Sequence, residues 1–235
     1  MKAAALVIVP TFNERDNVTI LARAVLDATP DAHLLFVDDA SPDGTGAILD
    51  GLAAGDARIT VMHRRGKLGL GTAYLEGFRR GLDLGYGYLV EMDADFSHDP
   101  VYLPELIGRA KRGADVGVGS RYGPGGGTEN WGLGRQLISR GGGLYARAVL
   151  GVPLRDLTAG FVCYRREALE GLDLRSVRSE GYAFQIEMKY RLLKAGCRIE
   201  EMPIRFVDRR VGQSKMSRRI FVEALTMVWR LRLSS

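Results

Sequence analysis

At 235 residues, the chain is long enough for one large α/β domain, and its 46% hydrophobic content is that of a globular protein. This composition excludes an intrinsically disordered chain. The net charge of +5 is uneven, since residues 205–235 contain eight Lys or Arg but only two acidic residues. A basic end on a nearly neutral body favours an anionic partner such as a phosphate, a lipid head group or nucleic acid.

Residues that commonly bind structural metals are scattered along the chain. Cys163 and Cys197 form no CxxC pattern, and the three histidines are far apart. We therefore expect no structural zinc site and a reduced, cytosolic compartment. The N-terminal apolar run ends at Pro10, which is too early for a signal peptide. No stretch approaches the roughly 18 consecutive apolar residues of a membrane span, so none is predicted.

Short β-rich runs alternate with helical patterns over the first half. The predicted strands are residues 4–9, 33–38, 58–63, 86–93 and 114–120. Helical spacing of apolar residues begins at Val18. Ser41-Pro42 and Asp99-Pro100 each predict a helix start, because an N-cap residue precedes Pro at the first helical position. This alternation predicts a mostly parallel sheet with helices on both faces, with ligands at the carboxyl ends of its strands.

The second half is less regular. Residues 123–132 are Gly-rich and predicted to form a loop, and residues 161–169 read as a strand turning into a helix. The remaining predictions are helices over 133–150, 183–195 and about 217–233, and a strand over 198–207. With no internal repeat and no long linker, we expect one domain over 1–217, followed by a basic amphipathic helix over 218–235.

The strongest chemical signal is EMDADFSHDP, which follows an apolar strand. It places Asp93 and Asp95 where the strand leaves the sheet. Mg²⁺ and Mn²⁺ commonly bind through one or two carboxylates together with substrate phosphates. The alternative is a solvated acidic loop whose Asp99 caps the next helix. The position at the end of a central strand favours a metal and ligand site.

Two other segments indicate a nucleotide. Asp38 and Asp39 close the second strand, where an acidic residue accepts hydrogen bonds from a nucleoside or, alternatively, stabilises the following helix start. The segment HRRGKLGLGTAY, residues 63–74, resembles a phosphate-binding loop. It lacks the third Gly of the dinucleotide fingerprint and the GK[ST] of a P-loop. We therefore predict nucleotide contact without NAD binding or ATP hydrolysis.

Four basic residues in the second half are candidates for phosphate binding: Arg121, Arg135, Arg209 and Lys215. Guanidinium groups bind phosphate through two parallel hydrogen bonds. Each of these residues taken alone has an alternative explanation as an ordinary surface cation.

Together these motifs resemble glycosyltransferase family 2, and within it the polyprenyl (dolichyl) monophosphate mannose synthases. The matching strings run in family order over residues 7–217: IVPTFNE, VDDASPDGTG, HRRGKLGLGTAY, EMDADFSHDP, GSRYGPGGGTENWGLGRQLIS, DLTAGFVCYRREAL, GYAFQIE and GQSKMS. The resemblance implies an α/β GT-A fold, GDP-mannose as donor, a polyprenyl phosphate as acceptor, and Mg²⁺ or Mn²⁺ as cofactor.

The resemblance also assigns roles to individual residues. It implies donor binding by Pro10, Thr11, Asn13, Glu14, Asp39, Arg64, Lys67, Asp93, Ala94 and Asp95. It places the acceptor phosphate and the sugar among Arg121, Arg135, Ser139, Arg209 and Lys215. Asp95 and these four basic residues are the expected catalytic residues, and Asp93 and Asp95 the metal ligands. Ser97 stands where some relatives have a metal-ligating Gln, and its shorter side chain leaves positions open to donor phosphate and water.

The substrates imply the mechanism. A lipid phosphate is already anionic, so it needs positioning in a dry cationic site rather than a general base. Direct displacement inverts the anomeric centre and gives β-linked mannosyl phosphate. Glu187 stands roughly where other family 2 enzymes place a base, and we interpret it as structural or sugar-contacting.

The basic C-terminal helix has two interpretations. Its apolar residues lie in a membrane interface with the arginines on anionic head groups, or they pack on the core. The first implies a peripheral protein at the cytoplasmic face of a membrane, with or without a separate anchoring subunit. The rival functions are a UDP-glucose-dependent lipid-phosphate glucosyltransferase or another family 2 transferase, a non-catalytic nucleotide-sugar-binding subunit, and a nucleic-acid-binding protein. No nucleic acid is expected, because aromatics do not interleave with the basic residues.

Overall fold

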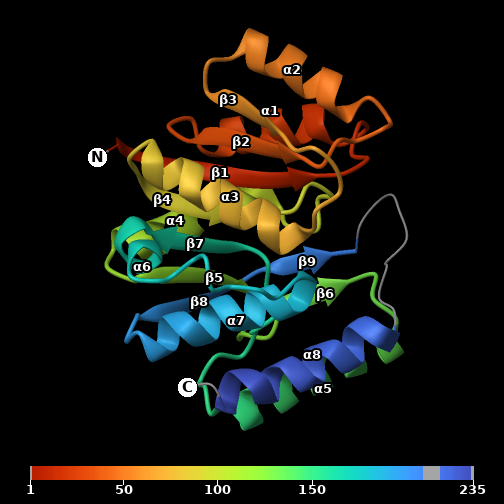
Figure 1. Cartoon of the computed structure of the whole chain (residues 1–235), viewed down its shortest axis with the longest axis vertical. Coiled ribbons are helices and arrows are strands. Elements are labelled where there is room, and N and C mark those ends of the chain that lie inside the picture. Colours follow the sequence, from red (N-terminus) through yellow and green to blue (C-terminus); the bar gives the residue numbers. More distant parts are fainter. Residues whose placement is uncertain (1, 209–217, 234–235) are drawn as a thin grey trace.

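The computed structural model describes residues 2–208 and 218–233, without the side chains of residues 2, 3, 135 and 218–225. Its centre is a seven-stranded sheet in the order β3-β2-β1-β4-β7-β5-β8 (Figure 1). The strands are β1 (Lys2–Thr11), β2 (His33–Asp38), β3 (Ile59–His63), β4 (Tyr86–Glu91), β5 (Val116–Ser120), β7 (Val162–Arg165) and β8 (Ile199–Pro203). Only β7 runs antiparallel to its neighbours, so the predicted mostly parallel sheet is confirmed.

The helices cover both faces of this sheet. They are α1 (Val18–Ala28), α2 (Thr45–Gly55), α3 (Leu70–Asp83), η1 (Pro100–Tyr102), α4 (Leu103–Lys111), α5 (Leu133–Leu150), α6 (Arg166–Glu170), α7 (Gly181–Lys194) and α8 (Arg218–Leu233). One core cluster joins the sheet to α1, α2 and α4, and the other joins it to α3, α6 and α7. The sheet is therefore buried on both faces, as a parallel sheet requires.

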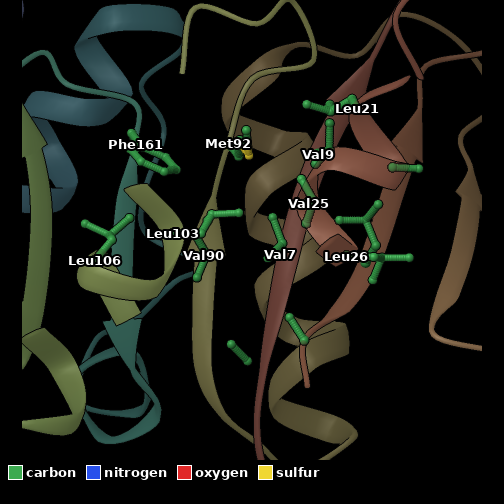
Figure 2. Close-up of a cluster of buried hydrophobic side chains, with 14 of the residues drawn as sticks. Val7, Val9, Leu21, Val25, Leu26, Val90, Met92, Leu103, Leu106 and Phe161 are labelled. Atoms are coloured by element: carbon green, nitrogen blue, oxygen red, sulfur yellow. The ribbon is translucent and has the colours of Figure 1, made fainter. Parts of the chain in front are cut away.

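The first cluster shows why these sequences form these elements. Figure 2 shows apolar side chains from β1, α1, α4 and the end of β4 meeting between the sheet and the helices. Alternate residues of β1 point to this face, while the helix supplies residues at helical spacing. The helical members are Val18, Leu21, Ala22, Val25 and Leu26, all buried as their spacing predicted.

A smaller layer lies beyond the β8 edge of the sheet, where α5 and α8 run side by side (Figure 1). These two helices form a third apolar cluster with α7. In α8, Val228 is buried, whereas Trp229 and Leu233 are exposed, so the helix packs on the body and also presents apolar side chains to solvent. Across the part of the chain described, no helix is both long and apolar enough to cross a bilayer.

Three local predictions were wrong. The helix after Ser41-Pro42 begins only at Thr45, because the Ser41 hydroxyl donates to Asp38 instead of capping a helix, and Asp43 accepts the Thr45 N–H. The predicted strand 198–207 divides at Ile204 into β8 and a separate strand, β9 (Arg205–Val207).

The third error concerns the Gly-rich loop. It contains β6 (Gly127–Glu129), which pairs with β9 in a two-stranded parallel sheet. By contrast, Asp99 caps η1 by accepting the Val101 N–H, as predicted.

Candidate functional site

The loops after β1 and β2 are joined by one buried carboxylate. Asp38 accepts hydrogen bonds from the hydroxyls of Thr11 (3.1 Å) and Ser41 (2.6 Å), and from the Ser41 N–H. The Ser41 hydroxyl in turn accepts the N–H of Asn13, whose φ of 63° turns the chain out of β1. These hydrogen bonds fix the predicted donor-binding loop to the neighbouring strand end.

Pro10 and Glu14 flank this joint. Pro10 is half-buried within β1, where it lies opposite Val37 of β2. Glu14 is half-buried too: its N–H donates to the Thr45 hydroxyl at 3.0 Å, and its carboxylate accepts from Asn17. Both predicted donor residues therefore lie at the carboxyl end of β1, on the same edge as Asp38.

Asp39 and Arg64 form a buried ion pair. The Arg64 Nη1 donates to Asp39 Oδ1 at 2.6 Å, and the other oxygen of Asp39 accepts the N–H groups of Leu68 and Gly69 at 3.1 and 3.4 Å. The Arg64 Nη2 donates to the Thr72 hydroxyl. The pair therefore shapes the loop between β3 and α3, and direct nucleotide contact by either residue remains a prediction.

The rim of this loop is cationic and aromatic. Lys67 is exposed, and its Nζ lies 4.1 Å from the centre of the Phe12 ring, a cation–π distance. Glu180 anchors the same loop by accepting the Gly71 N–H at 2.9 Å. Gly69 has φ of 103°, and a Cβ there would meet the Glu180 carboxylate at 2.6 Å. The positive φ thus favours glycine at position 69, and a larger residue there would displace the Glu180 carboxylate.

The acidic pair follows β4, which ends two residues before Asp93. Asp93 Oδ1 accepts the Tyr74 hydroxyl at 3.2 Å, and Asp95 Oδ1 accepts the Ser97 N–H at 3.0 Å. Ala94, Asp95 and Ser97 are buried, whereas Asp93 is partly exposed.

These donors fit a divalent cation of the Mg²⁺ type, because carboxylate oxygens are its preferred protein ligands. Among the described residues, no group of three or more His, Cys, Asp or Glu side chains is placed to hold a metal ion.

His98 lies behind the acidic pair in an aromatic setting. Its ring stacks on Phe161 at 5.1 Å and meets the edge of Phe206 at 5.3 Å. The Asp93 N–H donates to its Nδ1 at 3.5 Å. Burial lowers the pKa of His98 to about 4, so the imidazole is neutral at pH 7 and supports the loop through packing. The motif search passed over this residue, although it stands within EMDADFSHDP.

Arg121, at the end of β5, is held by Asp156. Its Nε and Nη2 donate to the two carboxylate oxygens at 2.7 and 2.6 Å, and Nη2 also donates to the Thr158 hydroxyl. Burial opposes the charge, yet Asp156 outweighs it and raises the pKa of Arg121 well above its usual value. The guanidinium carbon lies 5.3–5.7 Å from the ring centres of Tyr122, Trp131 and Phe206.

The other predicted acceptor residues are only partly described. The Ser139 hydroxyl accepts from the Tyr122 hydroxyl at 2.6 Å, which links Ser139 to the surroundings of Arg121. Arg135 belongs to α5, but its side chain lies outside the described residues, as do Arg209 and Lys215 altogether. The structure therefore brings together two of the five predicted acceptor residues.

Glu187 is buried and fully engaged. Its carboxylate accepts the Ser179 N–H at 3.1 Å and pairs with Arg191 at 2.6 Å. These contacts support the structural interpretation, because they fix the turn that precedes α7. The motifs did not identify Asp156 or Tyr74 as site residues, although both fall within strings quoted for the family.

The sheet order, the acidic pair after β4 and the cationic site after β5 define a GT-A glycosyltransferase. Solved structures confirm the fold. A glucosyl-3-phosphoglycerate synthase from Mycobacterium tuberculosis aligns with a TM-score of 0.67 at 18% identity, over 99% of this chain and 79% of that one. A mannosyltransferase from Pyrobaculum calidifontis, solved with GDP-Man and Mn²⁺, gives 0.67 at 16% identity, over 100% and 65%.

The chain belongs to glycosyl transferase family 2, whose model matches residues 6–173. It is 49% identical to a polyprenol monophosphomannose synthase from Mycolicibacterium smegmatis, over 97% of this chain and 87% of that protein. It is 48% identical to an undecaprenyl-phosphate mannosyltransferase from Micrococcus luteus, over 98% and 94%. The family predicted from the motifs is therefore confirmed.

Proposed function

We propose that this protein transfers mannose from GDP-mannose to a polyprenyl phosphate and inverts the anomeric centre. One observation carries the proposal. The Asp93–Asp95 pair follows β4 and the Asp156-bound Arg121 follows β5, and these two strands of the same sheet are separated only by β7. This arrangement suits a diphosphate leaving group on one side and a phosphate nucleophile on the other. The names of the two relatives near 50% identity support mannose as the transferred sugar and a polyprenyl phosphate as the acceptor.

Asp93 and Asp95 would hold Mg²⁺ or Mn²⁺. When bound, such an ion neutralises the negative charge that develops on the leaving diphosphate. Asp95 is oriented for this by the Ser97 N–H, and Asp93 by the Tyr74 hydroxyl. The backbone amide of Ser97, rather than its side chain, is the group that the structure brings to Asp95.

The loops after β1, β2 and β3 would bind the nucleoside. Thr11, Asn13, Glu14 and Asp39 lie at that edge, and Asp38 holds the first two loops together. Lys67, exposed on the rim of the β3–α3 loop, would meet the diphosphate.

On the acceptor side, Arg121 would position the lipid phosphate, helped by Ser139 and by the predicted Arg135, Arg209 and Lys215. The phosphate attacks as an anion, so no proton has to be removed. Neutral His98 is consistent with this, because its lowered pKa makes it a poor base at pH 7. The aromatic rings around Arg121 limit water and strengthen its charge interactions.

Two helices would rest on the membrane that contains the acceptor. Leu133 and Leu137 of α5 and Trp229 and Leu233 of α8 are exposed, and Leu133 and Leu233 are nearly 80% so. Exposed apolar side chains on two adjacent helices are typical of an interfacial surface. We infer a peripheral position at the cytoplasmic face. Binding to protein-free vesicles would show that no anchoring subunit is required.

The test is product formation by the purified protein with a polyprenyl phosphate, Mg²⁺ or Mn²⁺, and either GDP-mannose or UDP-glucose. We expect a mannosyl phospholipid with a β linkage from GDP-mannose only. Product from UDP-glucose alone would replace the donor assignment, and no product from either donor would refute transferase activity toward this acceptor. An α linkage would refute direct displacement.

A further inference from the structure

A basic cavity of about 470 Å³ lies next to Arg121, on the side of α5. Its lining combines the segment after β5, three positions of α5 and the segment that follows that helix. The lining residues are Arg121, Tyr122, Gly123, Gly126, Arg140, Leu144, Arg147 and Arg155. Neither Asp93 nor Asp95 contributes to it, so it is separate from the candidate metal site.

The four arginines lie at different depths. Arg121 is buried, Arg147 is half-buried, and Arg140 and Arg155 are exposed. Arg147 Nε is buried with no hydrogen-bond partner, whereas burying an N–H of this kind normally requires one. The Arg140 guanidinium lies 5.9 Å from the centre of the Tyr122 ring, which also faces Arg121. The cavity therefore has one cation at its base and others toward its mouth.

The carboxylates near this cavity are already engaged. Both oxygens of Asp156 bind Arg121, and both oxygens of Glu201 accept backbone N–H groups, those of Arg155 and Asp156. Within the described residues, no carboxylate forms an ion pair with Arg140, Arg147 or Arg155. Several like charges around one cavity repel each other, and a bound anion would relieve that repulsion.

The position of the cavity on α5 indicates the kind of anion. Leu133, Leu137, Arg140, Leu144 and Arg147 recur at spacings of four and three, so they share one face of the helix. The first part of that face is exposed and apolar, and the second part is basic and lines the cavity. A ligand with acyl chains on the leucines and a phosphate on the arginines fits both parts.

We propose that this cavity binds the phosphate of an anionic phospholipid head group and so orients the enzyme on its membrane. The site is additional to that for the acceptor phosphate; among the described lining residues, the two share Arg121. The proposal does not depend on which sugar is transferred, since binding is measured without donor or metal.

The test is co-sedimentation of the full chain with vesicles of phosphatidylcholine, alone or with about 30% phosphatidylglycerol. We expect stronger binding to the anionic vesicles, and a loss of about tenfold or more of that preference in R147Q/R155Q. Because Arg147 is half-buried, a second variant, R140Q/R155Q, changes two exposed positions and should lose preference in the same direction. Circular dichroism establishes that both variants fold.

The matched control is R23Q/R80Q, which removes the same charge from exposed positions on α1 and α3. It should keep the preference for anionic vesicles. An equal loss in this control would overturn the proposal, because net charge alone would then explain binding. Unchanged preference in both cavity variants would overturn it as well.

Two more measurements separate other occupants of the cavity. Inorganic phosphate that raises the melting temperature of the unmodified chain but not of R147Q/R155Q, with vesicle binding equal in the two proteins, would show a soluble-anion site and overturn the lipid assignment. A tenfold rise in KM for detergent-dispersed polyprenyl phosphate in R147Q/R155Q would show that the cavity belongs to the acceptor site, and would also overturn it. Failure of mannose transfer would leave the vesicle result intact.

Discussion

The candidate site contains two buried Arg–Asp ion pairs, one on the donor side and one on the acceptor side, which have similar geometry but different surroundings. On the donor side Arg64 binds Asp39, and on the acceptor side Arg121 binds Asp156, each with a shortest N–O distance of 2.6 Å. All four residues are buried. Removing one partner of a buried ion pair strongly destabilises the folded protein, because the other charge is left buried without compensation.

The surroundings of the two pairs differ. Arg64 also contacts the Gly69 carbonyl, the Thr72 hydroxyl and, at 3.2 Å, Glu76, so its charge is used by the β3–α3 loop and the start of α3. Arg121 instead meets three aromatic rings and opens onto a cavity with three more arginines. The donor side is thus built by contacts internal to the chain, whereas the acceptor side retains positive charge for a ligand.

The largest expected effect lies between the two pairs, at the acidic pair. Asp95→Asn keeps the shape of the side chain but removes a negative ligand for the cation, and we expect kcat to fall about 10³-fold. The measurement is mannosyl transfer at saturating GDP-mannose, with unfolding followed in parallel. The exposed Asp27→Asn on α1 is the control for loss of one charge. Activity of Asp95→Asn within tenfold of the unmodified enzyme would contradict the assignment.

The second largest effect is expected from breaking the acceptor-side pair of Arg121 and Asp156. Asp156→Asn leaves the Arg121 guanidinium buried without its carboxylate, so we expect the free energy of unfolding to fall by about 3–5 kcal/mol. Because Arg121 then loses its orientation, kcat/KM for the polyprenyl phosphate should fall about 100-fold. Denaturant unfolding and acceptor titrations measure the two effects. GDP affinity serves as the internal control, and a matching loss there would remove the distinction between the sides.

Breaking the donor-side pair should lower the free energy of unfolding by less than breaking the acceptor-side pair. In Asp39→Asn, Glu76 still supplies a carboxylate near Arg64, so we expect a loss of only about 1–3 kcal/mol of unfolding free energy. The KM for GDP-mannose should rise about tenfold as the loop at residues 64–72 loosens, while the KM for the lipid phosphate stays unchanged. A rise in the KM for the lipid phosphate alone would contradict the assignment of this pair to the donor side.

Local patterns predicted most of the fold. The strand 33–38 and the helix 133–150 have the predicted bounds, because apolar runs and turn residues mark both ends. The errors at Ser41-Pro42 and at β6 and β9 have different causes. The first is a local competition, because Asp38, three residues earlier, accepts the Ser41 hydroxyl that would otherwise cap a helix. The second is a long-range effect, because β6 forms only by pairing with β9, which is distant in the sequence.

Contacts between residues distant in the sequence also limited what could be predicted about the candidate site. The motifs located Asp93, Asp95 and Arg121 because strand ends are visible in the sequence. They could not show that Arg64 binds Asp39, 25 residues away, or that Arg121 binds Asp156, 35 residues away. Pairings over such separations depend on the folded sheet, so sequence spacing carries no signal for them.

The smallest expected effect concerns the buried Lys189 of α7, whose hydrogen bonds connect β4 with the segment before β7. Its Nζ donates to the Ala159 carbonyl at 2.6 Å and to Gln185 Oε1 at 3.0 Å, and the Gln185 amide donates to Glu91 of β4. Burial lowers the pKa of Lys189 to about 8, although Glu91 opposes the shift. Above pH 8 the folded state therefore releases a proton that the unfolded chain keeps until pH is near 10.5, so this residue's contribution to stability rises with pH.

Between pH 7 and pH 9 this contribution should increase by about 1 kcal/mol, and Lys189→Met should lack the increase. The measurement is the difference in unfolding free energy between the unmodified chain and the variant at each pH, which cancels the tyrosine and cysteine titrations common to both. Lys194→Met, at an exposed position of the same helix, should leave the slope unchanged. Parallel curves of unfolding free energy against pH for the unmodified chain and Lys189→Met would mean that the buried lysine keeps an ordinary pKa.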